Sequence, residues 1–275
     1  MSEWANNQQS FSQEYRVDLV ICIDGNGSMR KMIENVKNAA KTFYSLFLQA
    51  MEENDPPKKV KPDGLRVKVI VFRDFADSSS TPLESTDGFF NLQNPAELDA
   101  FNRFVDGIEN IGGGDLPENA LEAIATALKS EWEPRGGRFR RQAILVFTDT
   151  LTYDLNNPQR RLADTYPSGM PRDLTELGNI WEVGDQELAP YYSPQNGRLI
   201  IFAPPHTGLE NDDPEHRTIE WERFSSWSRV WVVPVEANGG CADVDMKQAL
   251  AVLVGSFQNT FVNLRESIQV PAGAV

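Results

Sequence analysis

The amino-acid sequence predicts an α/β fold, in which an open, doubly wound and mainly parallel six-stranded sheet carries helices on both faces. Two observations carry this prediction. Short segments rich in β-branched residues alternate along the chain with longer segments that have apolar residues at helical spacing. The central strand segments are apolar on both faces, which is typical of strands buried in a parallel sheet.

The strand segments predict a definite order in the sheet. In chain order the six expected strands cover residues 16–24, 65–75, 88–92, 141–149, 198–204 and 229–235. We expect the spatial order 3-2-1-4-5-6, with 16–24 and 141–148 adjacent at the centre and 88–92 as a short antiparallel edge. The first and fourth strands must be neighbours if the polar residues that follow them are to meet.

The helical segments lie between these strands. Residues 29–53 have apolar residues at helical spacing, and the turn-rich loop 54–64 ends that helix. A second helix over 95–107 opens with Pro95, a residue that suits the first helical turn. Further helices are expected at about 117–132, 172–182 and 243–264.

One domain is expected to hold nearly the whole chain. Residues 1–14 are interpreted as a flexible N-terminal lead-in, 15–266 as the domain, and 267–275 as a C-terminal tail. Residues 150–197 are less regular and rich in prolines and polar residues, so we interpret them as an insertion on the loop edge of the sheet.

The charge and cysteine content narrow the possible partners and compartments. The net charge is −14, which disfavours a nucleic-acid partner and favours basic proteins or metal cations. The two cysteines, Cys22 and Cys241, do not suggest a disulfide framework. The polar N-terminus does not resemble a signal peptide, and no apolar run is long enough to span a bilayer. We therefore expect a cytoplasmic protein without a membrane partner.

Oxygen-bearing side chains gather where strands end. Ligands of open parallel sheets bind beyond the carboxyl ends of the strands. Carboxylate, amide and hydroxyl oxygens suit Mg²⁺ or Mn²⁺, with Ca²⁺ also possible, and glycines let the backbone turn tightly between such ligands. The predicted ligands, in three separate loops, are Asp24, Asn26, Ser28, Asp115 and Asp149. The residues expected to support them are Gly25, Gly27, Asp74, Gly114 and Thr148.

Simpler roles remain open for several of these residues. Asp24 could cap the helix that follows it, and Asp115 could equally be the N-cap of the helix that opens at 116–117. Asp74 ends the second strand, where it would support the site or be solvated. His206 and His216 lie in an acidic loop without metal-ligand spacing, so we expect them on the surface.

The three loops resemble the metal-ion-dependent adhesion site of von Willebrand factor A domains. The family's first loop is Asp-x-Ser-x-Ser, usually followed by Met, and here the segment 24–29 is Asp-Gly-Asn-Gly-Ser-Met. The family's third loop, an apolar strand followed by Thr-Asp, matches Thr148-Asp149. The second loop departs from the family, because Asp115 stands where the family has Thr. A third carboxylate implies a site that holds metal well but attracts a partner's carboxylate less.

The resemblance covers roughly residues 15–265 and implies a Rossmann-like fold. "FRDFAD" (72–77) and "GGGDLPENAL" (112–121) further resemble a bacterial intracellular branch of the family, similar to the tellurite-resistance-associated and α-kinase-associated A domains. This branch implies a role beside protein kinases or phosphatases in bacterial stress systems.

The sequence leaves two classes of function open. The first is a divalent-cation-binding scaffold or adaptor that binds another protein through its metal-bearing face. The alternative is a Mg²⁺-dependent phosphoryl-transfer enzyme of the phosphatase kind, with Asp24 as nucleophile. The first reading is favoured because Asn26 stands where such phosphatases carry a proton-exchanging Asp. The absence of a recognisable signal peptide also disfavours a surface adhesin.

Overall fold

A computed structural model gives the fold of most of the chain. The described residues are 15–40, 42–54, 64–77, 80–111, 117–133, 139–204, 218–237, 241 and 243–257. The expected lead-in, the expected tail and the last residues of the 243–264 helix lie outside them, as do Gly114, Asp115, His206 and His216.

The centre of the fold is a seven-stranded sheet in the order β3-β2-β1-β5-β7-β9, with β4 also paired to β2. The strands are β1 (Tyr15–Asp24), β2 (Gly64–Phe72), β3 (Leu83–Ser85), β4 (Phe90–Asn91), β5 (Phe139–Phe147), β7 (Gly197–Ala203) and β9 (Val230–Pro234). Strand β1 lies between β2 and β5 and runs parallel to both. The predicted α/β fold and the central neighbours 16–24 and 141–148 are therefore confirmed.

The strand count and one strand end differ from the prediction. Both β3 and β4 pair antiparallel with β2, so the sheet has a seventh strand that we did not expect. Three residues are too few to show the alternation by which a strand is recognised. Strand β2 ends at Phe72 instead of residue 75, because the chain leaves the sheet at Arg73, whose amide donates to Pro82 O at 2.8 Å.

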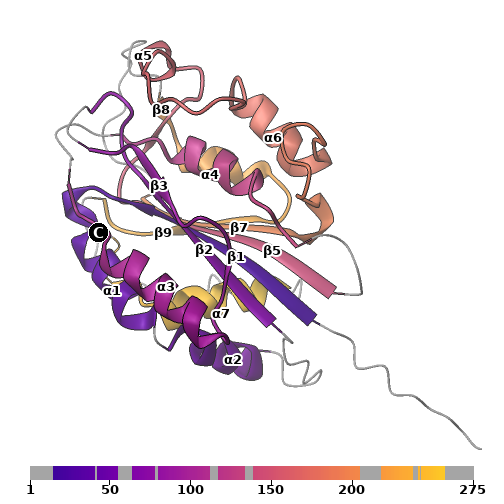
Figure 1. The fold of residues 1–275 in the computed structure, drawn as a ribbon. Helices are drawn as coiled ribbons and strands as arrows, with labels where there is room; N and C mark the ends of the chain where they lie inside the picture. The colour runs from indigo at the N-terminus through magenta and orange to yellow at the C-terminus, as the bar shows by residue number, and fades with distance from the viewer. Residues whose placement is uncertain are drawn as a thin grey trace, which may run out of the picture.

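Helices cover both faces of the sheet (Figure 1). One face carries α1 (Arg30–Ala40), α2 (Phe43–Asn54), α3 (Pro95–Asp106) and α7 (Met246–Phe257), and the other carries α4 (Ala120–Leu128) and α6 (Leu174–Val183). Alternation along β1 builds the two cores, because Leu19 and Ile21 pack toward the first face while Val20 and Cys22 pack toward the second.

Short elements connect the main strands and helices. They are the single-turn helices η1 (Gly27–Met29), η2 (Pro194–Asn196) and η3 (Trp221–Ser226), the short helix α5 (Pro158–Arg161), and a small antiparallel pair formed by β6 (Thr152–Tyr153) and β8 (Thr218–Ile219). The predicted helix at 172–182 is α6, which Asp173 caps by accepting from Glu176 N at 2.9 Å. No helix of the described residues is long and apolar enough to cross a membrane.

Two predicted helices are shorter than expected. The 29–53 segment contains two helices, and between them Thr42 donates from both its amide and its Oγ1 to Ala39 O, at 2.9 and 3.3 Å. The 117–132 segment is helical only in α4, because Glu118 forms a strand-like bridge with Thr152. The helix at 95–107 is confirmed as α3, and its start is fixed by Asn94, whose Oδ1 accepts from Ala96 N at 3.1 Å.

Candidate metal centre

Asp24 is the last residue of β1 and is fully buried. Its Oδ1 accepts a hydrogen bond from Asn26 N at 3.0 Å, and its Oδ2 accepts one from Thr148 Oγ1 at 2.8 Å. Thr148 directly follows β5, so the pairing of β1 with β5 brings the first and third predicted loops together. Thr148 thus orients the carboxylate of Asp24, the role expected of a residue that supports a metal ligand.

Asn26 and Ser28 form a short capping turn beside Asp24. The Oδ1 of Asn26 accepts hydrogen bonds from Ser28 N at 3.1 Å, from Met29 N at 3.3 Å and from the Ser28 hydroxyl. These bonds make Asn26 the N-cap of η1. The Nδ2 of Asn26 is buried without a hydrogen-bond partner among the described residues. A metal would have to compete with three donors for the amide oxygen, whereas Ser28 is exposed and its oxygen keeps lone pairs.

The electrostatics of the site come from two buried aspartates. Asp149 is 1% exposed and lies close enough to Asp24 for its charge to act on it. Burial raises the pKa of Asp24 to about 7, hydrogen bonds from Asn26 and Thr148 oppose the rise, and the charge of Asp149 adds to it. Two buried carboxylates of like charge are a favourable environment for a small divalent cation.

The available donors fit a hard cation, although they are fewer than predicted. Asp24, Asp149 and Ser28 would supply carboxylate and hydroxyl oxygens at the carboxyl edge of the sheet. Asp115 and Gly114, the predicted contribution of the second loop, lie outside the described residues. Within the part of the chain that the structure describes, no group of three or more His, Cys, Asp and Glu side chains is placed to hold a metal ion.

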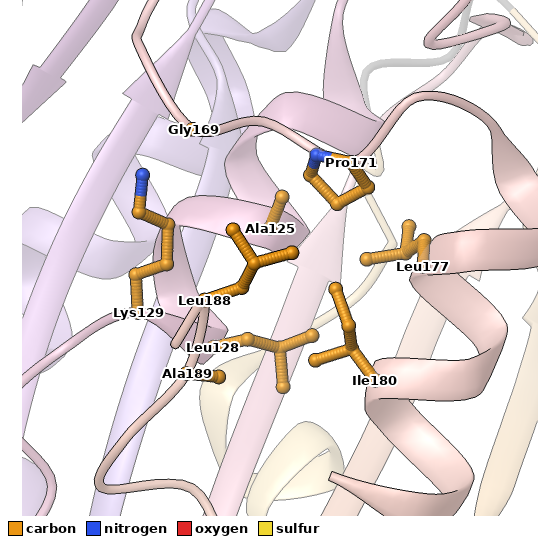
Figure 2. A pocket seen from close by; sticks show the side chains of 9 residues that line it. All are labelled: Ala125, Leu128, Lys129, Gly169, Pro171, Leu177, Ile180, Leu188 and Ala189. Atoms are coloured by element: carbon orange, nitrogen blue, oxygen red, sulfur yellow. The ribbon is translucent and has the colours of Figure 1, made fainter. Parts of the chain in front are cut away.

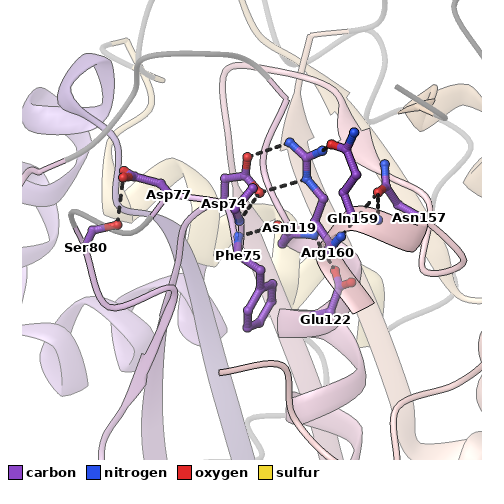
Figure 3. A network of polar contacts seen from close by, with 10 residues as sticks. Asp74, Phe75, Asp77, Ser80, Asn119, Glu122, Asn157, Gln159 and Arg160 are labelled. Atoms are coloured by element: carbon purple, nitrogen blue, oxygen red, sulfur yellow. Dashed lines mark hydrogen bonds and ion pairs between the residues drawn. The ribbon is translucent and has the colours of Figure 1, made fainter. Parts of the chain in front are cut away.

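Asp74 lies at the same edge but is committed to an ion pair. It is 3% exposed, and both of its oxygens accept from Arg160 of α5, Oδ1 from Nε at 2.9 Å and Oδ2 from Nη2 at 2.6 Å. The guanidinium of Arg160 also lies 3.6 Å from the centre of the Tyr153 ring. Figure 3 shows the pair between the loop after β2 and helix α5. Asp74 is therefore not a solvated side chain.

A polar network next to this pair contains a second buried acid with a raised pKa (Figure 3). Asn119 accepts from Phe75 N at 2.9 Å and donates to Glu122 Oε2 at 3.3 Å, while Tyr166 donates to Glu122 Oε1 at 3.0 Å. Burial raises the pKa of Glu122 to about 7 against the opposing effect of these hydrogen bonds. The sequence analysis did not identify this network, because its members come from segments far apart in the chain.

Sequence analysis also missed two residues beside Asp24. The thiol of Cys241 lies 3.4 Å from Thr148 O, and burial together with the charges of Asp149 and Asp24 raises the pKa of that thiol. Arg73 is 1% exposed, and its charge acts to lower the pKa of Asp24. An Arg directly after an apolar strand was the only signal in the sequence for such a residue, and for Cys241 we find none.

A pocket between α4 and α6 does not compete with this site as a ligand site. It is lined by apolar side chains such as Leu128, Leu177 and Ile180 (Figure 2). The lining side chains leave no space that a water molecule could enter, whereas ligand pockets usually measure roughly 300 Å³ or more.

Comparison with solved structures finds bacterial pilus proteins. The pilus adhesin SpaC from Lactobacillus rhamnosus GG, in its open conformation, is similar with 12% identity over 88% of this chain and 30% of that chain, at a TM-score of 0.47. The vWF domain of the type V pili tip protein Mfa5 from Porphyromonas gingivalis is 16% identical over 51% of this chain and 40% of that chain, at a TM-score of 0.32. The chain thus spans less than half the length of either protein. No curated protein matches it.

Comparison with protein families gives a match over more than half of the chain. The family model described as von Willebrand factor type A domain matches residues 18–169. This range begins in β1 and includes the loops after β1 and β5 that carry Asp24 and Asp149. The predicted resemblance is therefore confirmed at the level of the family, and the chain belongs to the von Willebrand factor type A domain family.

Proposed function

We propose that the chain is a protein-interaction module that binds a divalent cation, Mg²⁺ or Mn²⁺ first and Ca²⁺ as a further possibility, at the carboxyl edge of its sheet. Members of the von Willebrand factor type A family commonly act as metal-dependent interaction modules. The observation that carries the proposal is the buried pair of Asp24 and Asp149, with Thr148 bonded to Asp24 and Ser28 exposed nearby.

In this proposal each residue of the site has a separate task. Asp24, Ser28 and Asp149 bind the cation, and Asp115 adds a further ligand from the second loop. Thr148 holds Asp24, while the amide oxygen of Asn26 caps η1 and so fixes Ser28. The bound cation neutralises the two buried carboxylates and presents an open coordination position to a partner protein.

Thermal unfolding tests the metal. A cation that binds only the folded state raises the melting temperature, because at 100 times its Kd it adds roughly 2.7 kcal/mol to the free energy of unfolding. We expect a higher melting temperature with millimolar Mg²⁺ or Mn²⁺ than with EDTA, and no such rise in Asp24→Asn or Asp149→Asn. Asp99→Asn, at an exposed position of α3, is the control and should respond like the wild type. Identical melting temperatures with EDTA and with Mg²⁺, Mn²⁺ and Ca²⁺ would contradict the proposal.

The partner is the less specific part of the proposal. By resemblance to the bacterial intracellular branch, we propose a cytoplasmic protein partner, such as a kinase or phosphatase of a stress system, and neither nucleic acid nor membrane. A pull-down from the native host with and without chelator tests this, since the partner should be lost when the cation is removed. A partner captured equally with chelator would show that the metal-bearing face is not the interface.

The alternative of phosphoryl transfer receives no support from a specific contact among the described residues. Asn26 stands where a proton-exchanging acid would be needed, and its amide oxygen is bonded to η1. A metal-dependent turnover of an aryl phosphate that is lost in Asp24→Asn would nevertheless favour the enzyme.

A further inference from the structure

Arg73 connects three loops at the edge that carries the proposed metal site. It is the first residue after β2 and is 1% exposed. Its Nη1 donates to Thr81 O at 2.8 Å and to Glu84 Oε1 at 2.6 Å, and its Nη2 donates to Glu109 O at 2.7 Å. Thr81 belongs to the β2–β3 connection, Glu84 lies in β3, and Glu109 lies in the chain that leads from α3 toward Asp115.

The same guanidinium lies against the first metal-binding loop. A Cβ placed on Gly25 would lie 2.7 Å from Arg73 Nε and 2.8 Å from its Cζ, so only a glycine fits between Asp24 and Asn26 in this arrangement. The amide of Gly25 donates to Phe72 O at 2.9 Å, which holds the loop against the end of β2. Arg73 therefore contacts one predicted ligand loop and is bonded to the segment that precedes the other.

The burial of Arg73 has an energetic cost. The Nε of Arg73 is buried without a hydrogen-bond partner among the described residues, and an unsatisfied buried donor costs about 1–3 kcal/mol. A buried cation next to a cation site also repels the metal. Against both effects stand the three hydrogen bonds of the guanidinium, which join the β2–β3 connection, β3 and the segment after α3.

We infer that Arg73 is a positioning residue of the metal site, which holds the loop of Asp24 in place against the β2–β3 connection and the segment that follows α3. The inference rests on the proposed metal-binding function. The planar guanidinium is suited to this task, because it donates in several fixed directions at once, whereas the ammonium of lysine is a single point charge on a flexible stem.

Two variants of Arg73 distinguish a positioning role from an effect of its charge, because the two roles change the metal affinity in different directions. Arg73→Lys keeps the charge and loses the fixed fork, and Arg73→Gln loses both. If Arg73 positions the loops, both variants bind Mn²⁺ about tenfold or more weakly in calorimetric titration, which is the usual effect of losing a residue that orients metal ligands. If Arg73 acts only through its charge, Arg73→Lys binds like the wild type and Arg73→Gln binds more tightly, which would overturn the inference.

A purely structural role gives a third result. In that case both variants melt at a lower temperature but bind Mn²⁺ with wild-type affinity, and the inference is again overturned. Should neither variant fold, Glu84→Gln loosens the same guanidinium from its half-exposed side and should weaken Mn²⁺ binding by a smaller factor. Unchanged affinity in that variant would count against Arg73 as well. Wild-type protein that binds no Mn²⁺ refutes the proposed function itself, a result that Arg73 variants cannot produce.

Discussion

Asp24 and Asp74 follow neighbouring strands at the same edge of the sheet, yet their surroundings are opposite. Asp74, just after β2, is held by Arg160 through both of its oxygens. Asp24, at the end of β1, is equally buried, but among the described residues no cation forms an ion pair with it, and the repulsive charge of Asp149 acts on it more strongly than the attractive charge of Arg73. The two sites differ in whether a side chain of the protein forms a direct ion pair with the carboxylate.

The amino end of β1 shows the same contrast within one strand. Asp18 accepts from Arg66 at 2.8 and 2.6 Å and from Glu133 N at 2.8 Å, so its charge is balanced by the chain. A buried carboxylate that serves only the fold brings its own cation, because an unpaired buried charge is costly. Asp24 lacks such a partner among the described residues, which fits a site that receives its cation from solution.

The largest expected effect is the loss of the Asp74–Arg160 pair. Arg160→Met should lower the free energy of unfolding by about 4 kcal/mol, because it leaves a carboxylate buried without its charge partner. Urea denaturation measures the change. The double variant Asp74→Asn/Arg160→Met is the control and should recover part of the loss, since no charge is stranded. A loss below about 1 kcal/mol would mean that the pair behaves like an exposed one.

Glu122 is a buried acid whose contribution to stability depends on pH. Its folded pKa of about 7 lies above the ordinary value of 4.5, so the folded state keeps a proton that the unfolded state releases. Between pH 4.5 and 7 the stability therefore falls as pH rises, by about 3 kcal/mol in total, and the loss is complete above pH 7.

The variant Glu122→Gln isolates this contribution, because it cannot titrate and its amide oxygen can still accept from Tyr166. The difference in unfolding free energy between wild type and variant should change in favour of the variant from pH 4.5 to pH 7.5. Subtraction removes the contributions of other acids, Asp24 included. A difference that is constant across this range would show that Glu122 is ionised at the same pH in both states.

The sequence was sufficient to predict that β1 and β5 are neighbours and hence that the loops of Asp24 and Asp149 meet. Both follow long apolar strands, and the requirement that their loops converge fixes β1 beside β5. The start of α3 could also be placed, because Pro95 is a local signal for the first turn of a helix. Residues whose role is set by nearby sequence are predictable in this way.

Other parts of the site depend on contacts between distant segments. Arg160 and Asp74 are 86 positions apart in the chain, and Cys241 and Thr148 are 93 apart. No local sequence pattern therefore predicts either contact. The strand β3 has too few residues to show a period. Asn26 illustrates a different difficulty, because the same amide oxygen could bind a metal or cap η1, and the sequence does not distinguish these uses.

The smallest change that we predict is an increase in the free energy of unfolding, whereas Arg160→Met should decrease it. Asp24→Asn should raise the free energy of unfolding of the metal-free protein by about 1 kcal/mol at pH 8, because it removes a buried charge that Asp149 repels. The gain is limited, since the new amide must replace the carboxylate in accepting from Asn26 N and Thr148 Oγ1.

Urea denaturation in EDTA measures this gain. The same measurement in Mg²⁺ compares the stabilities of wild type and variant when the metal is present. With metal present the wild type is stabilised and the variant is not, so the order of their stabilities should reverse. Asp18→Asn is the matched change at the other end of the same strand. It should destabilise the protein in both buffers because it leaves Arg66 without its carboxylate partner. If Asp24→Asn also destabilises in EDTA, then Asp24 is a structural residue like Asp18, and the contrast between the paired and the metal-accepting aspartate is wrong.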